Sequence, residues 1–234
     1  MTRIIASKEF RTYFYSPVAY IWMLTFVVLV NWFFFRMFFI TRQADMRPLF
    51  SLMPWFLLFL IPAATMGKWA EERKLGTMEL LLTLPVTSRD AVMGKFWGCV
   101  GLVATALLLT LPLPLTVSTL GQMDWGPVMG GYLGLLLLSS AYLAIGLFVS
   151  SVTQNQIIAF VLGILGCFAL YVTSESLVTA VLPSFLAPIA EYVGASYHFD
   201  SIGRGVVDSR DLIYFVSVTG FFLWCNWRVI ETRR

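Results

Sequence analysis

Residues 125–174 read WGPVMGGYLGLLLLSSAYLAIGLFVSSVTQNQIIAFVLGILGCFALYVTS, a run of 50 residues that contains no Asp, Glu, Lys or Arg. A transmembrane helix needs about 20 mostly apolar residues to cross about 30 Å of hydrocarbon. The run is therefore too long for one span and suits two, with a turn at the polar residues 150–156. This stretch predicts an all-α integral membrane protein.

The composition of the whole chain supports this class. Of its 234 residues, 59% are hydrophobic and 12% are charged, whereas soluble domains carry about 25% charged residues. An apolar chain without repeats and with only three cysteines is neither disordered nor a disulfide-stabilised scaffold. The 16 basic and 13 acidic residues form no long basic block, which excludes nucleic acid as a partner.

Four further charge-free stretches raise the number of predicted spans to six: residues 12–35, 48–67, 96–123 and 212–227. Lys and Arg residues near the ends of spans are retained on the cytoplasmic side of a membrane. With a cytoplasmic N-terminus, eleven of these residues lie inside and five lie outside. We therefore expect a multi-pass protein with both termini in the cytoplasm.

Residues 1–16 predict a separate helix before the first span. Arg3, Ser7 and Arg11 fall on one face at helical spacing, and the apolar side chains fall on another (Ala6, Phe10, Tyr13 and Phe14). This pattern is typical of a basic amphipathic helix that lies along the inner membrane surface. Two interpretations stay open, a simple interfacial anchor and an elbow helix that also contacts a cytoplasmic partner.

The long charged cytoplasmic loop covers residues 68–95, with nine ionisable side chains in 28 residues. Within it, Gly76 interrupts one helix, Thr77 can cap the next helix, and Pro85 ends it. The second helix carries an exposed apolar ridge beside Glu79, made of Met78, Leu81, Leu82 and Pro85. Such a ridge favours a protein partner. The alternative is a solvated connector whose leucines rest on the bilayer.

The outer segment, residues 183–211, predicts one or two short helices that dip into the outer leaflet and return. A polar outer cap, residues 198–211, follows these helices. We expect Arg204 and Arg210 to pair with Asp200, Asp208 or Asp211 in a structural role, and contact with a substrate is the alternative.

Glycines recur every four residues at the start of the fourth predicted span, at Gly126, Gly130 and Gly134. Small residues at this spacing allow a second helix to approach closely. The pattern fits packing within one subunit as well as it fits dimerisation.

Catalytic motifs are missing from the sequence. It contains no P-loop, and its single histidine, His198, excludes a zinc-protease motif and most metal chemistry. The spans also lack the buried acids and bases that ion-coupled carriers usually have. We therefore expect a non-catalytic protein with no catalytic residue, metal site or cofactor of its own. A stand-alone six-span carrier or channel stays as the alternative to a subunit of a larger transporter.

Residues 71–86 read EERKLGTMELLLTLPV and contain the pattern E-R-x-x-G-T-x-E-x-L-L-x-x-P between the second and third predicted spans. This pattern, in this position of a six-span chain with an N-terminal amphipathic helix, resembles the permease subunit of ABC-2 type transporters. The outer run at residues 197–215 resembles the gliding-motility-associated subgroup of that family. The resemblance extends over essentially the whole chain.

The resemblance implies one ABC-2 transmembrane domain over residues 1–234, in the bacterial inner membrane. It implies a dimer of permeases bound to two ATPase subunits, which hold ATP and Mg, and re-entrant outer helices between spans five and six. An auxiliary membrane-anchored protein with a large outer domain often accompanies this subgroup. The chain would couple ATP hydrolysis to export or to mechanical work.

The resemblance also implies residue roles. A cytoplasmic coupling helix at about residues 77–84 would sit in each ATPase. The residues expected to couple to the ATPase are Glu71, Glu72, Arg73, Gly76, Thr77, Met78, Glu79, Leu80, Leu81, Leu82, Pro85 and Val86. The residues expected to form the outer cap are His198, Asp200, Arg204, Gly205, Asp208, Arg210 and Asp211.

Overall fold

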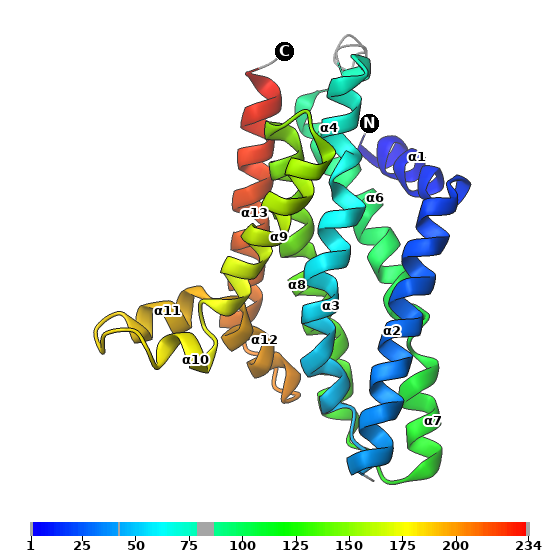
Figure 1. Cartoon of the computed structure of the whole chain (residues 1–234), viewed down its shortest axis with the longest axis vertical. Helices are drawn as coiled ribbons and strands as arrows, with labels where there is room; N and C mark the ends of the chain where they lie inside the picture. The colour runs from blue at the N-terminus through cyan, green and yellow to red at the C-terminus, as the bar shows by residue number, and fades with distance from the viewer. Residues whose placement is uncertain (1, 42, 79–86, 233–234) are drawn as a thin grey trace.

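The computed structural model describes residues 2–41, 43–78 and 87–232, and the regular elements in these ranges are all helices (Figure 1). The all-α prediction is confirmed. The helices are α1 (Thr2–Tyr15), α2 (Pro17–Thr41), α3 (Arg47–Thr65), α4 (Gly67–Lys74), α6 (Ser88–Leu108), α7 (Pro112–Leu120), α8 (Trp125–Val152), α9 (Gln156–Val172), α10 (Ser176–Thr179), α11 (Ala187–Val193), α12 (Ala195–Gly203) and α13 (Ser209–Glu231).

Five helical stretches of the described ranges are long and apolar enough to cross a membrane, so the chain is a multi-pass membrane protein. They are Pro17–Thr41, Arg47–Lys74, Ser88–Leu120, Trp125–Val152 and Ser209–Glu231. Helix α9 occupies the position of the fifth predicted span and is apolar, but it is only 17 residues long. Since spanning helices have about 17–25 residues, a sixth span stays a prediction.

Short polar side chains fix where the helices begin. The side chains of Thr87, Asp124, Asn155 and Asp208 each accept a hydrogen bond from a backbone N–H in the first turn of the following helix, at the starts of α6, α8, α9 and α13. Such caps satisfy donors that a helix leaves unpaired at its N-terminus. The cap at Asn155 confirms the predicted turn inside the long charge-free run.

The third predicted span, residues 96–123, is not a single helix. Helix α6 ends at Leu108, and α7 begins at Pro112. A proline has no N–H to donate and its ring collides with the preceding turn, but it is well suited to the first position of a helix. The stretch therefore continues as two helices. Helix α6 also begins earlier than predicted, at Ser88.

Helix α8 is the centre of the bundle and packs against α3, α6, α9, α12 and α13. The glycine repeat lies where α12 crosses it. A Cβ atom on Gly130 would collide with the carbonyl oxygen of Ile202, and one on Gly134 would lie 3.2 Å from the Phe199 ring. These glycines therefore serve packing within one subunit.

Three short helices, α10, α11 and α12, connect α9 to α13. Figure 1 shows α10 and α11 projecting sideways from the bundle, whereas α12 returns to it. Helices α11 and α12 lie within residues 183–211, where one or two short helices were expected. Their entry into the outer leaflet stays a prediction.

Candidate functional site

Helix α1 crosses α6 over a smooth surface of glycines. A Cβ atom on Gly98 would lie 2.6 Å from the Cβ of Glu9, and one on Gly101 would lie 2.7 Å from the ring of Phe10. The two helices therefore approach closely only because these positions carry no side chain. Helix α1 lies where the amphipathic helix was expected, and Ile5, Ala6 and Phe10 of its apolar side pack against α6.

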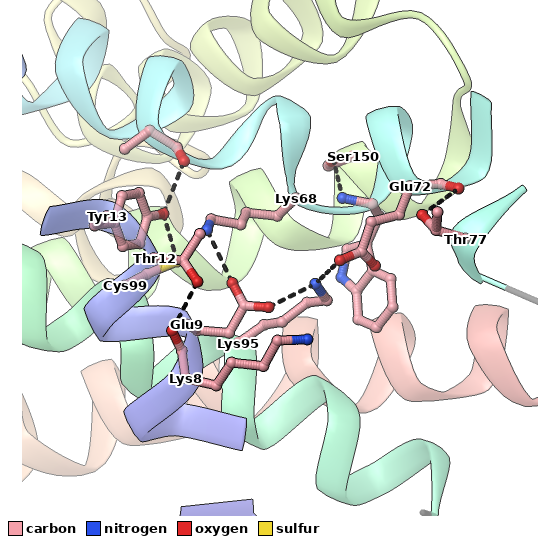
Figure 2. A network of polar contacts seen from close by, with 12 residues as sticks. Lys8, Glu9, Thr12, Tyr13, Lys68, Glu72, Thr77, Lys95, Cys99 and Ser150 are labelled. Carbon is pink, nitrogen blue, oxygen red and sulfur yellow. Dashed lines mark hydrogen bonds and ion pairs between the residues drawn. The ribbon is translucent and has the colours of Figure 1, made fainter. Parts of the chain in front are cut away.

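A chain of four charged side chains lies where α1, α4 and α6 meet (Figure 2). The Glu9 carboxylate of α1 pairs with Lys68 Nζ at 2.9 Å and with Lys95 Nζ at 3.1 Å. Lys95 of α6 also pairs with the Glu72 carboxylate of α4 at 2.5 Å. We call these four residues the ionic junction.

The ionic junction is charge-balanced and largely shielded from solvent. Lys95 is 1% exposed and Glu9 is 9% exposed. Burial by itself would raise the pKa of Glu9, but attraction to Lys95 and Lys68 and the hydrogen bonds from both lower it to about 2. Glu9 is therefore ionised at neutral pH. Removing one member would leave a buried charge without its partner, which costs far more than losing a surface ion pair.

Helix α4 is also fastened to α8. Ser150 Oγ accepts hydrogen bonds from the backbone N–H groups of Trp69 and Ala70, each at 3.1 Å, and donates one to the Met66 carbonyl at 2.8 Å. Arg73 Nη1 donates to the Val152 carbonyl at 3.0 Å. The segment that leads into the predicted coupling helix is thus held by α1, α6 and α8 together.

The predicted coupling residues occupy several different environments. Glu72 lies in the ionic junction, Arg73 contacts α8, and Glu71 is exposed. Gly76 adopts a φ of 72°, a left-handed conformation that favours glycine, so it ends α4 as predicted. The hydroxyl of Thr77 donates to the Glu72 carbonyl at 3.2 Å.

Met78 was expected in the exposed apolar ridge, but the structure places it elsewhere. Its side chain is 5% exposed and belongs to the hydrophobic core, so it is not part of an exposed surface. The remaining predicted coupling residues lie outside the described residues: Glu79, Leu80, Leu81, Leu82, Pro85 and Val86.

The outer cap is organised around His198 rather than around its arginines. His198 Nδ1 lies 2.7 Å from Asp211 Oδ1, and its Nε2 lies 3.0 Å from the Tyr192 carbonyl oxygen. Among the described residues, no ion pair within 4.0 Å holds Arg204 or Arg210. Burial raises the pKa of Asp200, and Arg204, which still attracts the Asp200 carboxylate, opposes this rise.

The other outer-cap residues have separate positions. The Asp208 side chain caps α13 by accepting from the backbone N–H of Arg210 at 3.0 Å. Gly205 has a φ of 89° and packs against the backbone of Gly126. Asp200 is exposed at the surface of α12.

Both ring nitrogens of His198 lie within hydrogen-bond distance of an oxygen atom, at a position where His198 is 1% and Asp211 is 4% exposed. The Tyr214 ring stacks on His198 with centroids 4.0 Å apart.

Three members of the ionic junction, Glu9, Lys68 and Lys95, were not among the predicted site residues. Glu9 and Lys95 each carried a signal in the sequence. Glu9 is the only acid of residues 2–15 and lies one turn from Ile5 and from Tyr13, on the apolar side of the helix. Lys95 is the only charge between Asp90 and Asp124. A lone charge on an apolar face points to a buried partner.

The protein-family model described as ABC-2 family transporter protein matches residues 18–226, which run from the beginning of α2 into α13. No curated protein matches the sequence.

Proposed function

The chain belongs to the ABC-2 transporter family, and from this premise we propose that it is the permease subunit that couples ATP binding and hydrolysis by a separate ATPase to export or to mechanical work. Two copies of the chain would bind two ATPase subunits, and ATP and Mg would be held by the ATPases. The complex would lie in the bacterial inner membrane with both chain termini in the cytoplasm.

The observation that carries this proposal is the attachment of α4. This helix follows α3 and leads into residues 75–87, and the family pattern at residues 71–86 begins in its last turn. Its Glu72 joins α6 and α1 through the ionic junction, and its first turn is held by Ser150 of α8. A force applied by an ATPase to residues 77–84 would therefore reach several helices of the bundle at once.

The finer features of the proposal rest on the sequence. We assign the coupling helix to residues 77–84 and the subgroup to the gliding-motility-associated permeases, because of the runs at residues 71–86 and 197–215. An auxiliary membrane-anchored protein with a large outer domain is part of this assignment. Residues 187–203 would form the re-entrant outer helices.

The first test is affinity purification of the tagged chain from its native membranes in mild detergent, followed by mass spectrometry and an ATPase assay. We expect a stoichiometric ATPase with a P-loop. Recovery of a membrane-anchored protein with a large outer domain would support the subgroup. A homo-oligomer without an ATPase under several extraction conditions would contradict the proposal and favour a stand-alone carrier or channel.

The second test addresses the coupling helix itself. Leu81→Asp and Glu79→Lys should each abolish the association with the ATPase, while the protein still folds and inserts, because they change the apolar and charged parts of the proposed contact. Glu191→Lys, at an exposed position of α11, is the matched control for the second change and should keep the ATPase bound. Unchanged association in both loop variants would show that this helix is not the coupling element.

A further inference from the structure

The exposed side of α1 forms a continuous basic stripe. Seven residues of α1 line one shallow surface: Arg3, Ile4, Ser7, Lys8, Arg11, Thr12 and Tyr15. Three of them are cations and none is an acid. The one acid of α1, Glu9, faces the other way and is neutralised by Lys68 and Lys95.

The other side of α1 is fully used by contacts within the protein. Ile5, Glu9 and Phe10 lie against the glycines of α6. Amphipathic helices normally bind membranes by inserting an apolar face, but the large apolar side chains that α1 exposes are only Ile4 and Tyr15, at 69% and 86%. Contact of its exposed side therefore rests chiefly on charge and on hydroxyl groups.

The position of α1 next to a helix that can span favours contact of this stripe with the membrane surface. Only Ser16 separates α1 from α2, a helix long and apolar enough to span. Figure 1 shows α1 at the flank of the bundle, with the end of α13 extending beyond it. Tyr15 is 86% exposed beside Arg11, and tyrosine is enriched at membrane interfaces.

We propose that Arg3, Lys8 and Arg11 bind the phosphate headgroups of anionic phospholipids in the cytoplasmic leaflet. Among the described residues none of these three side chains is in an ion pair, so all three charges face outward. Each cation near an anionic bilayer adds to the attraction, and the attraction weakens with salt. The lipid contact fixes the depth of α1, and the ionic junction passes that position to α4 and α6.

The test is a photoreactive amino acid at Ser7, between the three cations, in the purified full chain reconstituted into vesicles of phosphatidylcholine and phosphatidylglycerol. Mass spectrometry of the cross-linked products gives the ratio of the two lipids. We expect phosphatidylglycerol to be enriched about tenfold over its share of the bilayer, and the enrichment to fall at high salt. The same probe at Ser209, at the start of α13, should show no enrichment.

The variants separate charge from helix structure. Combined Arg3→Gln, Lys8→Gln and Arg11→Gln should reduce the ratio to that of the bulk bilayer, whereas Arg3→Lys with Arg11→Lys should retain the enrichment. Enrichment that survives loss of all three charges would overturn the proposal. Cross-linking in native membranes that yields a protein adduct at Ser7 in place of lipid would also overturn it, and would assign the stripe to an acidic protein surface. Neither result depends on whether an ATPase co-purifies.

Discussion

In the proposed topology, the end of the bundle that carries α4 is the cytoplasmic end and the end that carries α12 is the outer end. Each end contains a buried ionic contact, but the two contacts are built differently. At the cytoplasmic end, Glu9 pairs with lysines 59 and 86 residues away in the sequence, so three helices are joined. At the outer end, His198 pairs with Asp211 only 13 residues away and fastens α12 to α13. The first contact links distant parts of the chain, whereas the second closes a local segment.

The two contacts also differ in what keeps them intact. The ionic junction has two cations and two anions, and each cation has a carboxylate partner. The outer pair is a single contact between an imidazole and a carboxylate. Because the pKa of Glu9 is lowered to about 2, the cytoplasmic end should resist changes near neutral pH, and the outer end should respond to loss of the histidine. Three predictions test this contrast.

The largest effect is expected from Lys95→Met. This change leaves the carboxylates of Glu9 and Glu72 without their shared cation in a buried position, and breaking a buried ion pair costs about 3–5 kcal/mol. The measurement is the free energy of unfolding in detergent. Lys74→Met, at an exposed position of α4, is the matched control and should change little. Equal stability of the two variants would show that the junction does not hold the helices together.

The pH dependence of the cytoplasmic end is expected to come next. The pKa of Glu9 is lowered from 4.5 to about 2, so its contribution is complete above pH 4.5 and is lost as the pH falls through about 2. A shift of this size corresponds to about 3 kcal/mol. The measurement is the difference in unfolding free energy between the native sequence and Glu9→Gln over this pH range. For the exposed Glu191→Gln, the difference in unfolding free energy from the native sequence should not change with pH. A difference for Glu9→Gln that does not change with pH would contradict the prediction.

The smallest effect is expected from His198→Gln at the outer end. The change removes the imidazole that lies 2.7 Å from Asp211 Oδ1 and leaves the buried Asp211 carboxylate without this partner, which costs about 1–3 kcal/mol. Because the contact is local, hydrogen exchange should increase in α11 and α12 but not in α1. The conservative Tyr197→Phe, on the exposed side of α12, should leave exchange unchanged. Faster exchange in α1 as well would show that the two ends are coupled, and the contrast would then fail.

Much of the fold follows from local features of the sequence. The charge-free run at residues 125–174 predicts two helices because its polar centre contains Asn155, which caps the second helix. Pro17 and Gly76 mark helix boundaries because their backbone preferences act locally. The division between α6 and α7 was also accessible at Pro112, but the high hydropathy of the stretch suggested one uninterrupted span.

The sites depend on contacts between residues that are distant in the sequence, and local sequence patterns do not predict such contacts. Glu9 and Lys95 lie in different helices, and nothing in either segment names the other as its partner. Arg204 and Arg210 were natural partners for the nearby acids, yet the return of α12 to α13 brings His198 to Asp211 instead. Met78 follows a charged segment and was expected at the surface, but tertiary packing buries it.

The glycines of α6 have a consequence for how α1 is held. Helices usually lock together because side-chain ridges on one enter grooves on the other, but Gly94, Gly98 and Gly101 offer no ridges. The register of α1 along α6 is therefore set by polar contacts, at Glu9 with the lysines and at Thr2 with Asp90. The glycine surface by itself would allow α1 to shift along α6, and the electrostatic contacts prevent this shift.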